Sequence, residues 1–431
     1  MIGVSALYMV LMLVLIMSGV WIAFAIGFTA LLSLWQIMGD GVLSVIGTFA
    51  WQTTTSFTLT AVPLFILMGE VLYRSGLTDR LFAGLSQTLV GVPGGLLQAN
   101  IVGATLFAAS SGSSVASAAA LAPMTYKAEV TDRGYDERLV LGTLAAGGTL
   151  GILIPPSIVL ILYGATTGIS VGELFAAGVV PGLVLGLMYM LYISALGLAR
   201  PSIAPRPAGE AVPRATVRLR GLVQLWPFIL LAVIVLGSIY GGIATPTESA
   251  ALGAVVAFIL AVAFARIDRT IVRGIALTTV RTTSMLFFIV IAANVMAMVL
   301  SRYGVGQFFS GLAAGAGPAV SLLFIAALYL VLGMFFDAIS LMLLTLPVVM
   351  PIVQIVGYDP VWFGIILVIL LEAGLLTPPV GMNLFVVQGS TGANLSQVVR
   401  GSLPFIVLQL LALALFAAVP EIVLWLPQTM R

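Results

Sequence analysis

Two proline pairs inside long apolar segments constrain the fold of this chain more than any other feature. Pro155-Pro156 lies in GILIPPSIVLILYG, and Pro378-Pro379 lies in GLLTPPVGMNLFVV. Because proline has no amide hydrogen and clashes with the preceding helical turn, each pair predicts a break within a helix. Hydrocarbon tolerates the freed carbonyl groups only where protein or a water-filled cavity surrounds them. Each break is therefore a candidate binding site.

Composition places these helices in a membrane. Of the 431 residues, 61% are hydrophobic and 7% are charged. Many apolar runs reach the roughly 20 residues that a spanning helix needs, so we expect an all-α polytopic membrane protein. Cysteine and histidine are absent, which excludes disulfides and removes the commonest general base and metal ligand. The net charge of +2 argues against a nucleic-acid partner.

The two breaks belong to an internal duplication. A second proline follows 26 residues after the first proline of each pair, at Pro181 and Pro404. The predicted first repeat (1–199) has helices near 4–19, 21–38 and 54–73, a hairpin at 95–126, a broken helix at 138–167 and a helix at 171–199. The predicted second repeat (221–431) has helices near 222–240, 246–265 and 277–301, a hairpin at 318–356, a broken helix at 361–390 and a helix at 396–427. Matching breaks in two halves are typical of transporter binding sites.

Each hairpin is predicted to enter the membrane and return to the same side. Residues 95–109 and 115–126 flank the sequence SSGSS, and neither arm reaches the ~30 Å of the hydrocarbon core at about 1.5 Å per residue. The same holds for 318–335 and 341–356, around a break near Asp337. If the hairpins do not cross, each half has five crossings, and an odd number inverts the second half relative to the first.

The distribution of basic residues supports this topology. Cytoplasmic loops carry an excess of Lys and Arg. With the segment after helix 54–73 in the cytoplasm, 14 of the 17 cations face inside, while Arg302 and Arg431 lie outside. The proline-rich, basic segment 200–220 then becomes a cytoplasmic linker. Both termini are predicted on the outer side, and if 4–38 were one tilted helix only the N-terminus would change sides.

The polar groups of the first hairpin and first break are candidate ligands. Cations such as sodium take oxygen ligands, which unwound carbonyls and half-helix C-termini supply, while half-helix N-termini favour anions. Small residues also allow close helix packing, which is the alternative role of each. The candidates in the first half are Ser110, Ser111, Gly112, Ser113, Ser114, Gly148, Thr149, Pro155, Pro156 and Thr166.

The second half supplies a matching set. Its candidates are Asp337, Ser340, Glu372, Thr377, Pro378, Pro379, Gly381 and Asn383. Asp337 fits two roles equally, a cation ligand and a cap of the following half-helix. Glu372 lies six residues before Pro378, about 9 Å along a helix, and is a candidate for ion coupling or substrate selection. No cation lies at either tip or break, so an anion would be bound by half-helix N-termini, hydroxyls and bound cations.

Other acidic residues have structural interpretations. Glu248 completes a capping box that begins at Thr245, with proline at the first helical position. Ser170 and Glu173 repeat the same S-x-x-E spacing. Glu70 lies one turn from Arg74, which predicts an ion pair near the cytoplasmic face.

The runs around these candidates resemble one transporter family. AASSGSSVASAAALAPM, GGTLGILIPPS, GMFFDAISLMLLTLPVVMP and GLLTPPVGMNLF occur in this order and look like the large DctM-type membrane subunit of tripartite ATP-independent periplasmic (TRAP) transporters. The resemblance covers essentially the whole chain. It implies a secondary transporter of elevator type in a bacterial inner membrane, in which a domain with both hairpins moves against a scaffold, with both termini then periplasmic.

The same resemblance implies ligands and partners. It implies sodium-coupled uptake of a small carboxylate that a P-type periplasmic binding protein delivers, beside a small four-helix membrane subunit of Q type. No cofactor other than sodium as coupling ion is expected. The candidate sodium ligands are Ser110, Ser113, Asp337 and Thr377.

Other classes of function remain as alternatives. A stand-alone sodium/dicarboxylate symporter or antiporter of related fold would have the same architecture without partners. A channel would have similar breaks, and a membrane scaffold would not need them. An intramembrane hydrolase would need a Ser/His pair, a metal cluster or paired acids, and no GxGD-type motif occurs in the chain. We therefore do not expect an enzyme.

The re-entrant tip can be tested by labelling. The natural chain has no cysteine, so a Ser113→Cys variant carries a single thiol. We expect it to react with a membrane-impermeant thiol reagent in inner-membrane vesicles, because a hairpin tip meets water although it lies mid-run in the sequence. The unmodified protein gives the background, and complete protection of the thiol in every transport state would contradict a re-entrant tip.

Overall fold

The computed structural model describes residues 2–89, 91–112, 114–205, 215–265 and 267–430, and every regular element in them is helical. The first half contains α1 (Ile2–Met17), α2 (Ile22–Met38), α3 (Val42–Thr55), α4 (Ala61–Arg74), α5 (Leu77–Leu89), α6 (Leu96–Ser111), α7 (Ser114–Tyr126), α8 (Glu137–Leu153), α9 (Ile158–Thr167) and α10 (Val171–Ala199). Short turns η1 (Gly39–Gly41), η2 (Lys127–Thr131) and η3 (Pro201–Ile203) accompany them. The predicted all-α fold is confirmed.

The second half contains a matching series. Its helices are α11 (Ala215–Val223), α12 (Trp226–Tyr240), α13 (Pro246–Phe264), α14 (Arg269–Arg302), α15 (Val305–Ala316), α16 (Pro318–Gly333), α17 (Ala338–Val356), α18 (Pro360–Leu376), α19 (Met382–Thr391), α20 (Leu395–Ala418) and α21 (Glu421–Thr429). Helix α11 begins within the predicted linker. Each half thus has a helical hairpin, then a broken helix, then a long helix, in the predicted order.

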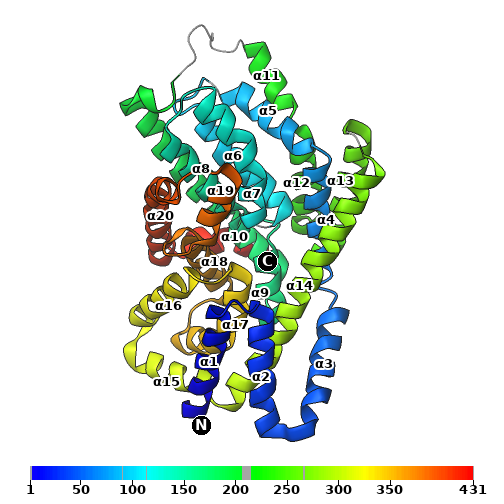
Figure 1. Cartoon of the computed structure of the whole chain (residues 1–431), viewed down its shortest axis with the longest axis vertical. Coiled ribbons are helices and arrows are strands. Elements are labelled where there is room, and N and C mark those ends of the chain that lie inside the picture. Colours follow the sequence, from blue (N-terminus) through cyan, green and yellow to red (C-terminus); the bar gives the residue numbers. More distant parts are fainter. Residues whose placement is uncertain (1, 90, 113, 206–214, 266, 431) are drawn as a thin grey trace.

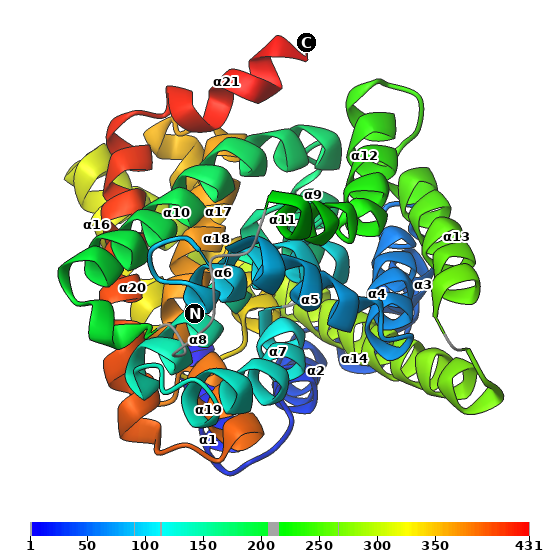
Figure 2. The same ribbon diagram turned by 90° about the horizontal axis from the view of Figure 1, so that it is seen from above.

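The helices pack in two groups. A scaffold group contains α2, α3 and α4 packed with α12, α13 and α14, and most of it lies at the right in Figure 2. A hairpin group contains the hairpins α6–α7 and α16–α17, the broken helices α8–α9 and α18–α19, and the long helices α10 and α20 (Figure 1). The two groups meet where α4 packs against α6 and α14 against α17.

The breaks lie where the prolines predict them. Helices α8 and α9 flank residues 154–157, and α18 and α19 flank residues 377–381. The bonds Pro155-Pro156 and Pro378-Pro379 are both cis. The hairpin tips lie at Gly112, which follows α6, and at residues 334–337, between α16 and α17.

Some predicted helix bounds are wrong. The helix expected at 54–73 begins at Ala61, and a separate helix α3 precedes it. The helix expected at 277–301 begins at Arg269, because the Asp268 side chain accepts the Ile271 N–H at 2.7 Å and caps it. The helices expected at 222–240 and 396–427 are each divided in two, and a proline lies at each division. Pro227 lies in the first turn of α12, after a 44° bend from α11, and Pro420 directly precedes α21.

Two amphipathic helices were not predicted at all. Helix α5 begins at Leu77 and α15 at Val305. These starts are 228 residues apart, the same separation as between the similar segments TTTSF at 53–57 and RTTSM at 281–285. Each helix follows a long helix and precedes a hairpin. Their occurrence at matching places supports the duplication.

The lengths of the hairpin arms fit the prediction in part. Helices α6 and α7 have 16 and 13 residues, about 24 and 20 Å, so they are shorter than the hydrocarbon core. The prediction is wrong for α17, which has 19 residues and is long and apolar enough to span. Its extra turn arises because the helix begins directly after Asp337 rather than at Leu341. In the described ranges, seven helices meet this criterion, or eight if the bent pair α11–α12 counts as one span.

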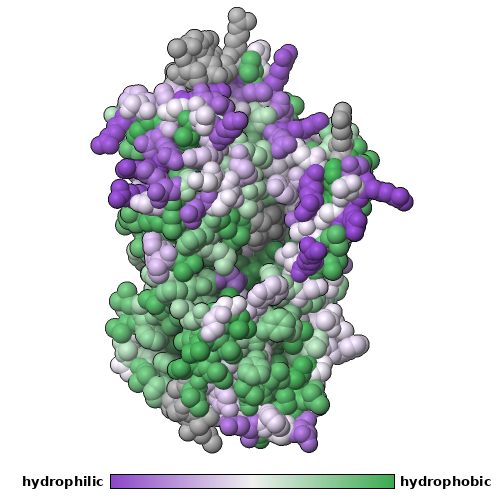
Figure 3. Space-filling model, viewed as in Figure 1, coloured by the Kyte–Doolittle hydropathy of each residue, from purple (hydrophilic) through white to green (hydrophobic). Residues whose placement is uncertain are grey.

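The surface is divided by polarity. In Figure 3, hydrophilic residues gather over the upper end, around α5 and α11 and the adjoining end of α14, and a smaller group lies at the lower end, whereas the flank between the two ends is largely apolar. A membrane protein shows this distribution because its flanks meet hydrocarbon. Three of the predicted structural roles also hold: Thr245 and Glu248 form the capping box, Ser170 accepts the Glu173 N–H, and Arg74 pairs with Glu70 at 2.7 Å.

Glycines set the close approach of the second hairpin to the second broken helix. A Cβ on Gly333 of α16 would lie 2.9 Å from the Cα of Gly374 in α18, and a Cβ on Gly374 would lie 2.7 Å from the Cα of Gly333. These neighbours are backbone atoms, so they cannot rotate away. The pair fixes α16 against the segment of α18 that precedes the second break.

We therefore expect Gly333→Ala to lower stability. The added methyl group forces the two helices apart, and overpacking of this kind costs about 1–3 kcal/mol. The measurement is the thermal unfolding midpoint of the purified protein in detergent. Gly389→Ala in α19 is the matched control, since a Cβ on Gly389 would meet no atom within 4 Å. Equal midpoints for the two variants would contradict the close packing.

Candidate functional site

In the first half, the hairpin tip packs directly on the break. Gly112 has a left-handed φ of 65°, and a Cβ there would lie 2.8 Å from Ile158 Cγ1 in the first turn of α9. Only glycine fits this conformation and this spacing without strain. The Ser157 side chain accepts the Leu160 N–H at 3.3 Å and caps α9. The polar tip therefore lies beside the start of a capped half-helix.

The second half repeats this contact with a hydrogen bond. The N–H of Gly381, in the break, donates to the carbonyl oxygen of Met334, in the tip, at 3.0 Å. Asp337 accepts the Ser340 N–H at 3.0 Å, so of its two predicted roles the structure displays the cap of α17. Ser340 is fully buried, and its hydroxyl has no partner in the described part of the chain. Thr377 donates to its own helix, at Ala373 O, 2.6 Å away.

The two halves are joined at the same place. Asn383, at the start of α19, donates through Nδ2 to the hydroxyl of Ser114, at the start of α7. The same amide nitrogen lies 3.5 Å from the carbonyl oxygen of Ala145 in α8. Asn383 is fully buried, and its Oδ1 is without a partner among the described residues. Asn383 therefore links the second break to the first hairpin and leaves one acceptor free.

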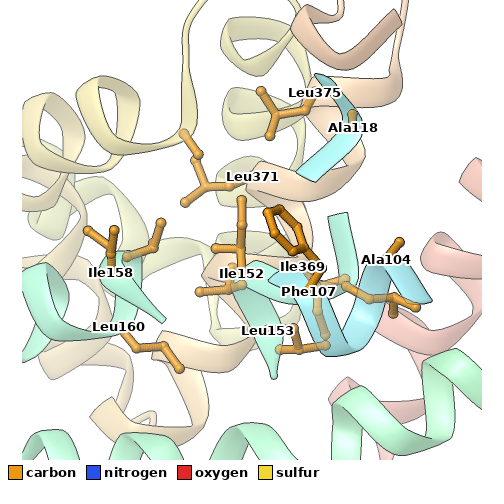
Figure 4. Packing of buried hydrophobic residues seen from close by; sticks show 14 of the residues in the cluster. Ala104, Phe107, Ala118, Ile152, Leu153, Ile158, Leu160, Ile369, Leu371 and Leu375 are labelled. Atoms are coloured by element: carbon orange, nitrogen blue, oxygen red, sulfur yellow. The ribbon is translucent and has the colours of Figure 1, made fainter. Parts of the chain in front are cut away.

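Apolar side chains enclose these polar contacts. Each of the core residues labelled in Figure 4 is at most 3% exposed, and they come from both arms of the first hairpin and from both broken helices: Ala104, Phe107, Ala118, Ile152, Leu153, Ile158, Leu160, Ile369, Leu371 and Leu375. An apolar interior of this kind strengthens electrostatic interactions with any ion that enters it.

The structure brings most of the predicted residues into one connected set. Three contacts link the tips and breaks: Gly112 with Ile158, Gly381 with Met334, and Asn383 with Ser114. These segments contain or directly adjoin Gly112, Ser114, Pro155, Pro156, Asp337, Ser340, Thr377, Pro378, Pro379, Gly381 and Asn383. Gly148 belongs to this set because a Cβ on it would lie 3.0 Å from Ser114 O. Thr149 and Glu372 lie one to two turns before the breaks, in a separate buried cluster.

Four further predicted residues are not placed in this set. Thr166 is exposed at the far end of α9, where it donates to Leu162 O at 2.8 Å, so it lies apart from the tips and breaks and its role at the site stays a prediction. Ser113 lies outside the described residues. Ser110 and Ser111 end α6, but their side chains lie outside the described part. The sodium ligands predicted at Ser110 and Ser113 therefore stay predictions.

A second buried acid was missed by sequence reasoning. Glu129 is 2% exposed in the turn η2, at the base of the first hairpin and outside the spans. Burial raises its pKa to about 8, against the lowering effects of a hydrogen bond from Asn100 and the charge of Arg133. Asn100 donates to Glu129 at 3.0 Å and to Thr143 of α8 at 3.2 Å. This cluster holds the base of the hairpin to the broken helix.

The site offers oxygen ligands and helix ends rather than basic side chains. No Lys or Arg occurs between Arg138 and Arg200, or between Arg302 and Arg400. In the described ranges, no three acidic side chains lie close enough to hold a metal ion together. Hydroxyl, amide and carbonyl oxygens at the tips suit a monovalent cation. The N-terminus of α19 has no side-chain cap, so its free N–H groups can bind an anion.

Comparison with known proteins identifies the family. The family model described as "Tripartite ATP-independent periplasmic transporter, DctM component" matches residues 9–422. The chain is 35% identical to the C4-dicarboxylate TRAP transporter large permease protein DctM of Vibrio cholerae, over 98% of this chain and 97% of that protein. It is 33% identical to the sialic acid TRAP transporter large permease protein SiaM of the same organism, over 96% of each.

A solved structure supports the fold. The YdaH transporter of Alcanivorax borkumensis superposes with a TM-score of 0.60 over 90% of this chain and 91% of that one, at 14% identity. At this identity the likeness concerns the fold alone. The match to the family model and the two relatives covers nearly the whole chain, including both hairpins and both breaks. The chain therefore belongs to the DctM family of tripartite ATP-independent periplasmic transporter components, and it is a transporter subunit rather than an enzyme.

Proposed function

We propose that this chain is the large permease of a sodium-coupled transporter that takes up a small organic acid delivered by a periplasmic binding protein. A small four-helix membrane subunit would pack alongside it in a bacterial inner membrane. The observation that carries the proposal is the meeting of two hairpin tips and two helix breaks, in which Ser114, Ser340 and Asn383 are buried polar residues. The name of the family supports the partners, and the relatives named for C4-dicarboxylate and sialic acid support a carboxylate substrate.

The free acceptors suggest where the coupling ion binds. Ser340 Oγ and Asn383 Oδ1 are buried without partners in the described residues, and a buried polar group that stays unpaired costs about 1–3 kcal/mol. A sodium ion at the tips would satisfy such oxygens together with the carbonyl ends of α16 and α18. Asp337 would add negative charge nearby, and Thr377 would contribute its hydroxyl oxygen.

The substrate would be recognised without a basic side chain. A carboxylate placed against the uncapped N-terminus of α19 would receive backbone N–H groups and the favourable helix dipole. Bound sodium would supply the remaining positive charge. This dependence predicts that substrate binds poorly when sodium is absent.

The division into two helix groups supports an elevator mechanism. Tips and breaks all belong to the hairpin group, whose members pack on one another, while the scaffold group meets it through α4 against α6 and α14 against α17. A body that carries the whole site can move as a unit against the scaffold. Alternating access then requires no rearrangement of the ligands.

Reconstitution tests the proposal. We expect uptake of a radiolabelled C4-dicarboxylate or sialic acid into proteoliposomes only when this chain, the small subunit, the binding protein and an inward sodium gradient are all present. The matched reactions omit one component each, with potassium replacing sodium in the last. Uptake that needs neither partner would favour a stand-alone symporter, and downhill flux unaffected by the binding protein would favour a channel. Either result would contradict the tripartite proposal.

Asn383→Ala tests the site itself. The substitution removes the free acceptor and leaves Ser114 Oγ without its donor, so we expect the apparent sodium affinity for uptake to weaken about 10-fold, equivalent to ~1.4 kcal/mol. Asn394→Ala is the control, because Asn394 is exposed and caps α20 by accepting the Ser396 N–H. If the sodium dependence of Asn383→Ala matched that of the control, Asn383 would not belong to the ion site.

A further inference from the structure

One acidic side chain is buried at the centre of the hairpin group. Glu372 of α18 is fully buried, and its neighbours along the helix, Leu371 and Ala373, are 1% exposed. An ionised carboxylate without a partner costs several kcal/mol in such a place. Glu372 therefore needs a compensating group, and its surroundings indicate which one.

Three polar side chains from three other helices contact or adjoin the carboxyl group. Gln409 of α20 donates through Nε2 to Glu372 Oε2 at 3.4 Å and to Thr149 Oγ1 of α8 at 3.2 Å. Tyr189 of α10 lies close enough to interact electrostatically with Glu372 and is fully buried. Gln409 Oε1 has no hydrogen-bond partner in the described residues. The Tyr189 hydroxyl interacts with Thr149, and the backbone of Leu153 in α8 interacts with the Glu372 carboxyl group. We call these four side chains the Glu372 cluster.

Among the described residues, no basic side chain pairs with the carboxyl group. The titratable groups on the helices packed against α18 lie elsewhere: Arg138 at the start of α8 bonds to Gln397, and Arg400 lies nine residues before Gln409 on α20, about 13 Å away. The other ionisable residues of these helices are Glu137, Tyr163, Glu173, Tyr192, Tyr329 and Glu421. Tyr189 is the one with an interaction to Glu372.

The duplication places the cluster symmetrically between the two breaks. Thr149 lies six residues before Pro155, and Glu372 lies six residues before Pro378. The two side chains are thus equivalent in the repeat, and Gln409 bridges them where α8 and α18 pack together. Any change in charge at Glu372 acts on both helices that lead into the breaks.

We propose that Glu372 is a proton-binding site, occupied in this packing as the neutral carboxylic acid and emptied at the stage of the transport cycle at which water reaches the carboxyl group. The step breaks the O–H bond of the acid, transfers the proton to water and leaves a carboxylate, without any redox change. The proposal rests on the proposed transport function, because it makes proton release part of the transport cycle.

The donors around the carboxyl group favour a proton over a metal ion. The Gln409 group that faces Glu372 is its amide nitrogen, which donates to an oxygen and does not coordinate a cation. A neutral acid accepts that donor on one oxygen and carries its own O–H on the other, so the buried group bears no charge that needs compensation. A metal ion would instead need several oxygens turned toward it.

Infrared spectroscopy tests the protonation state without any transport assay. We expect the purified wild-type protein at neutral pH to give the carbonyl band of a protonated carboxylic acid, and Glu372→Gln to lose that component. Glu421→Gln, which removes an exposed glutamate at the start of α21, should leave the band unchanged. A wild-type spectrum that does not differ from that of Glu372→Gln in this region would overturn the proposal.

Uptake measurements then link the proton to transport. In the complete reconstituted system we expect the uptake rate of wild-type protein to depend on pH, Glu372→Gln to lose this dependence, and Glu372→Asp, which keeps a carboxyl group, to retain it. A loss of one bound sodium ion in Glu372→Gln, measured with the radioactive ion, would show a metal site and refute the proton. Failure of uptake in all proteins would contradict the proposed function, whereas the infrared result would still decide the protonation of Glu372.

Discussion

Backbone groups that lack a helical partner control this fold, because hydrocarbon offers them no hydrogen bonds. The chain opens its helices at two hairpin tips and two proline breaks, and it satisfies the exposed groups by bringing these four places together. Ser157 and Asp337 cap the half-helices α9 and α17. The Gly381 N–H donates a hydrogen bond to the Met334 carbonyl oxygen. The need to pair these backbone groups therefore also assembles the site. The buried oxygens that have no partner in the described residues, Ser340 Oγ and Asn383 Oδ1, are the candidates for ligand binding.

Each half of the chain packs a half-helix against the hairpin of the other half. Helix α19, which follows the second break, packs on α7 of the first hairpin, where Asn383 donates a hydrogen bond to Ser114. In return, α9 of the first break packs on α17 of the second hairpin, and the Tyr163 hydroxyl of α9 donates to Pro360 O at 2.7 Å. Because each half completes the other, the hairpin group can move as one body. A rigid body of this kind is what an elevator mechanism needs.

The sequence predicts the breaks well because proline acts through local geometry that does not depend on the rest of the fold. It also predicts the hairpins, since their arms are bounded by glycine and serine. Helices α5 and α15 were missed because they are amphipathic and short, so they lack the long apolar run that marks a span. Thr166 is a site candidate because it follows the first break closely in sequence. In the structure it lies at the far end of the ten-residue helix α9, at a distance from the break. The partnership of Gln409 with Glu372 and Thr149 arises only from the packing of α20, and the one local signal was an amide within the apolar run LQLLALAL.

Few basic residues lie near the tips and breaks, so the charge of a bound carboxylate must be neutralised by something other than Lys or Arg side chains. A carboxylate that enters a low-dielectric interior needs compensation there, since charges interact strongly at low dielectric and desolvation is costly. The segments 81–126, 139–199 and 303–399 contain no Lys or Arg, so these segments bring no permanent positive charge to the tips and breaks. On the proposed mechanism, sodium at the tips and a proton on Glu372 neutralise the site reversibly. The loaded site can then cross the membrane near neutrality, and movement without the coupling ions is disfavoured by the same electrostatic cost, which is the physical basis of coupling in this arrangement.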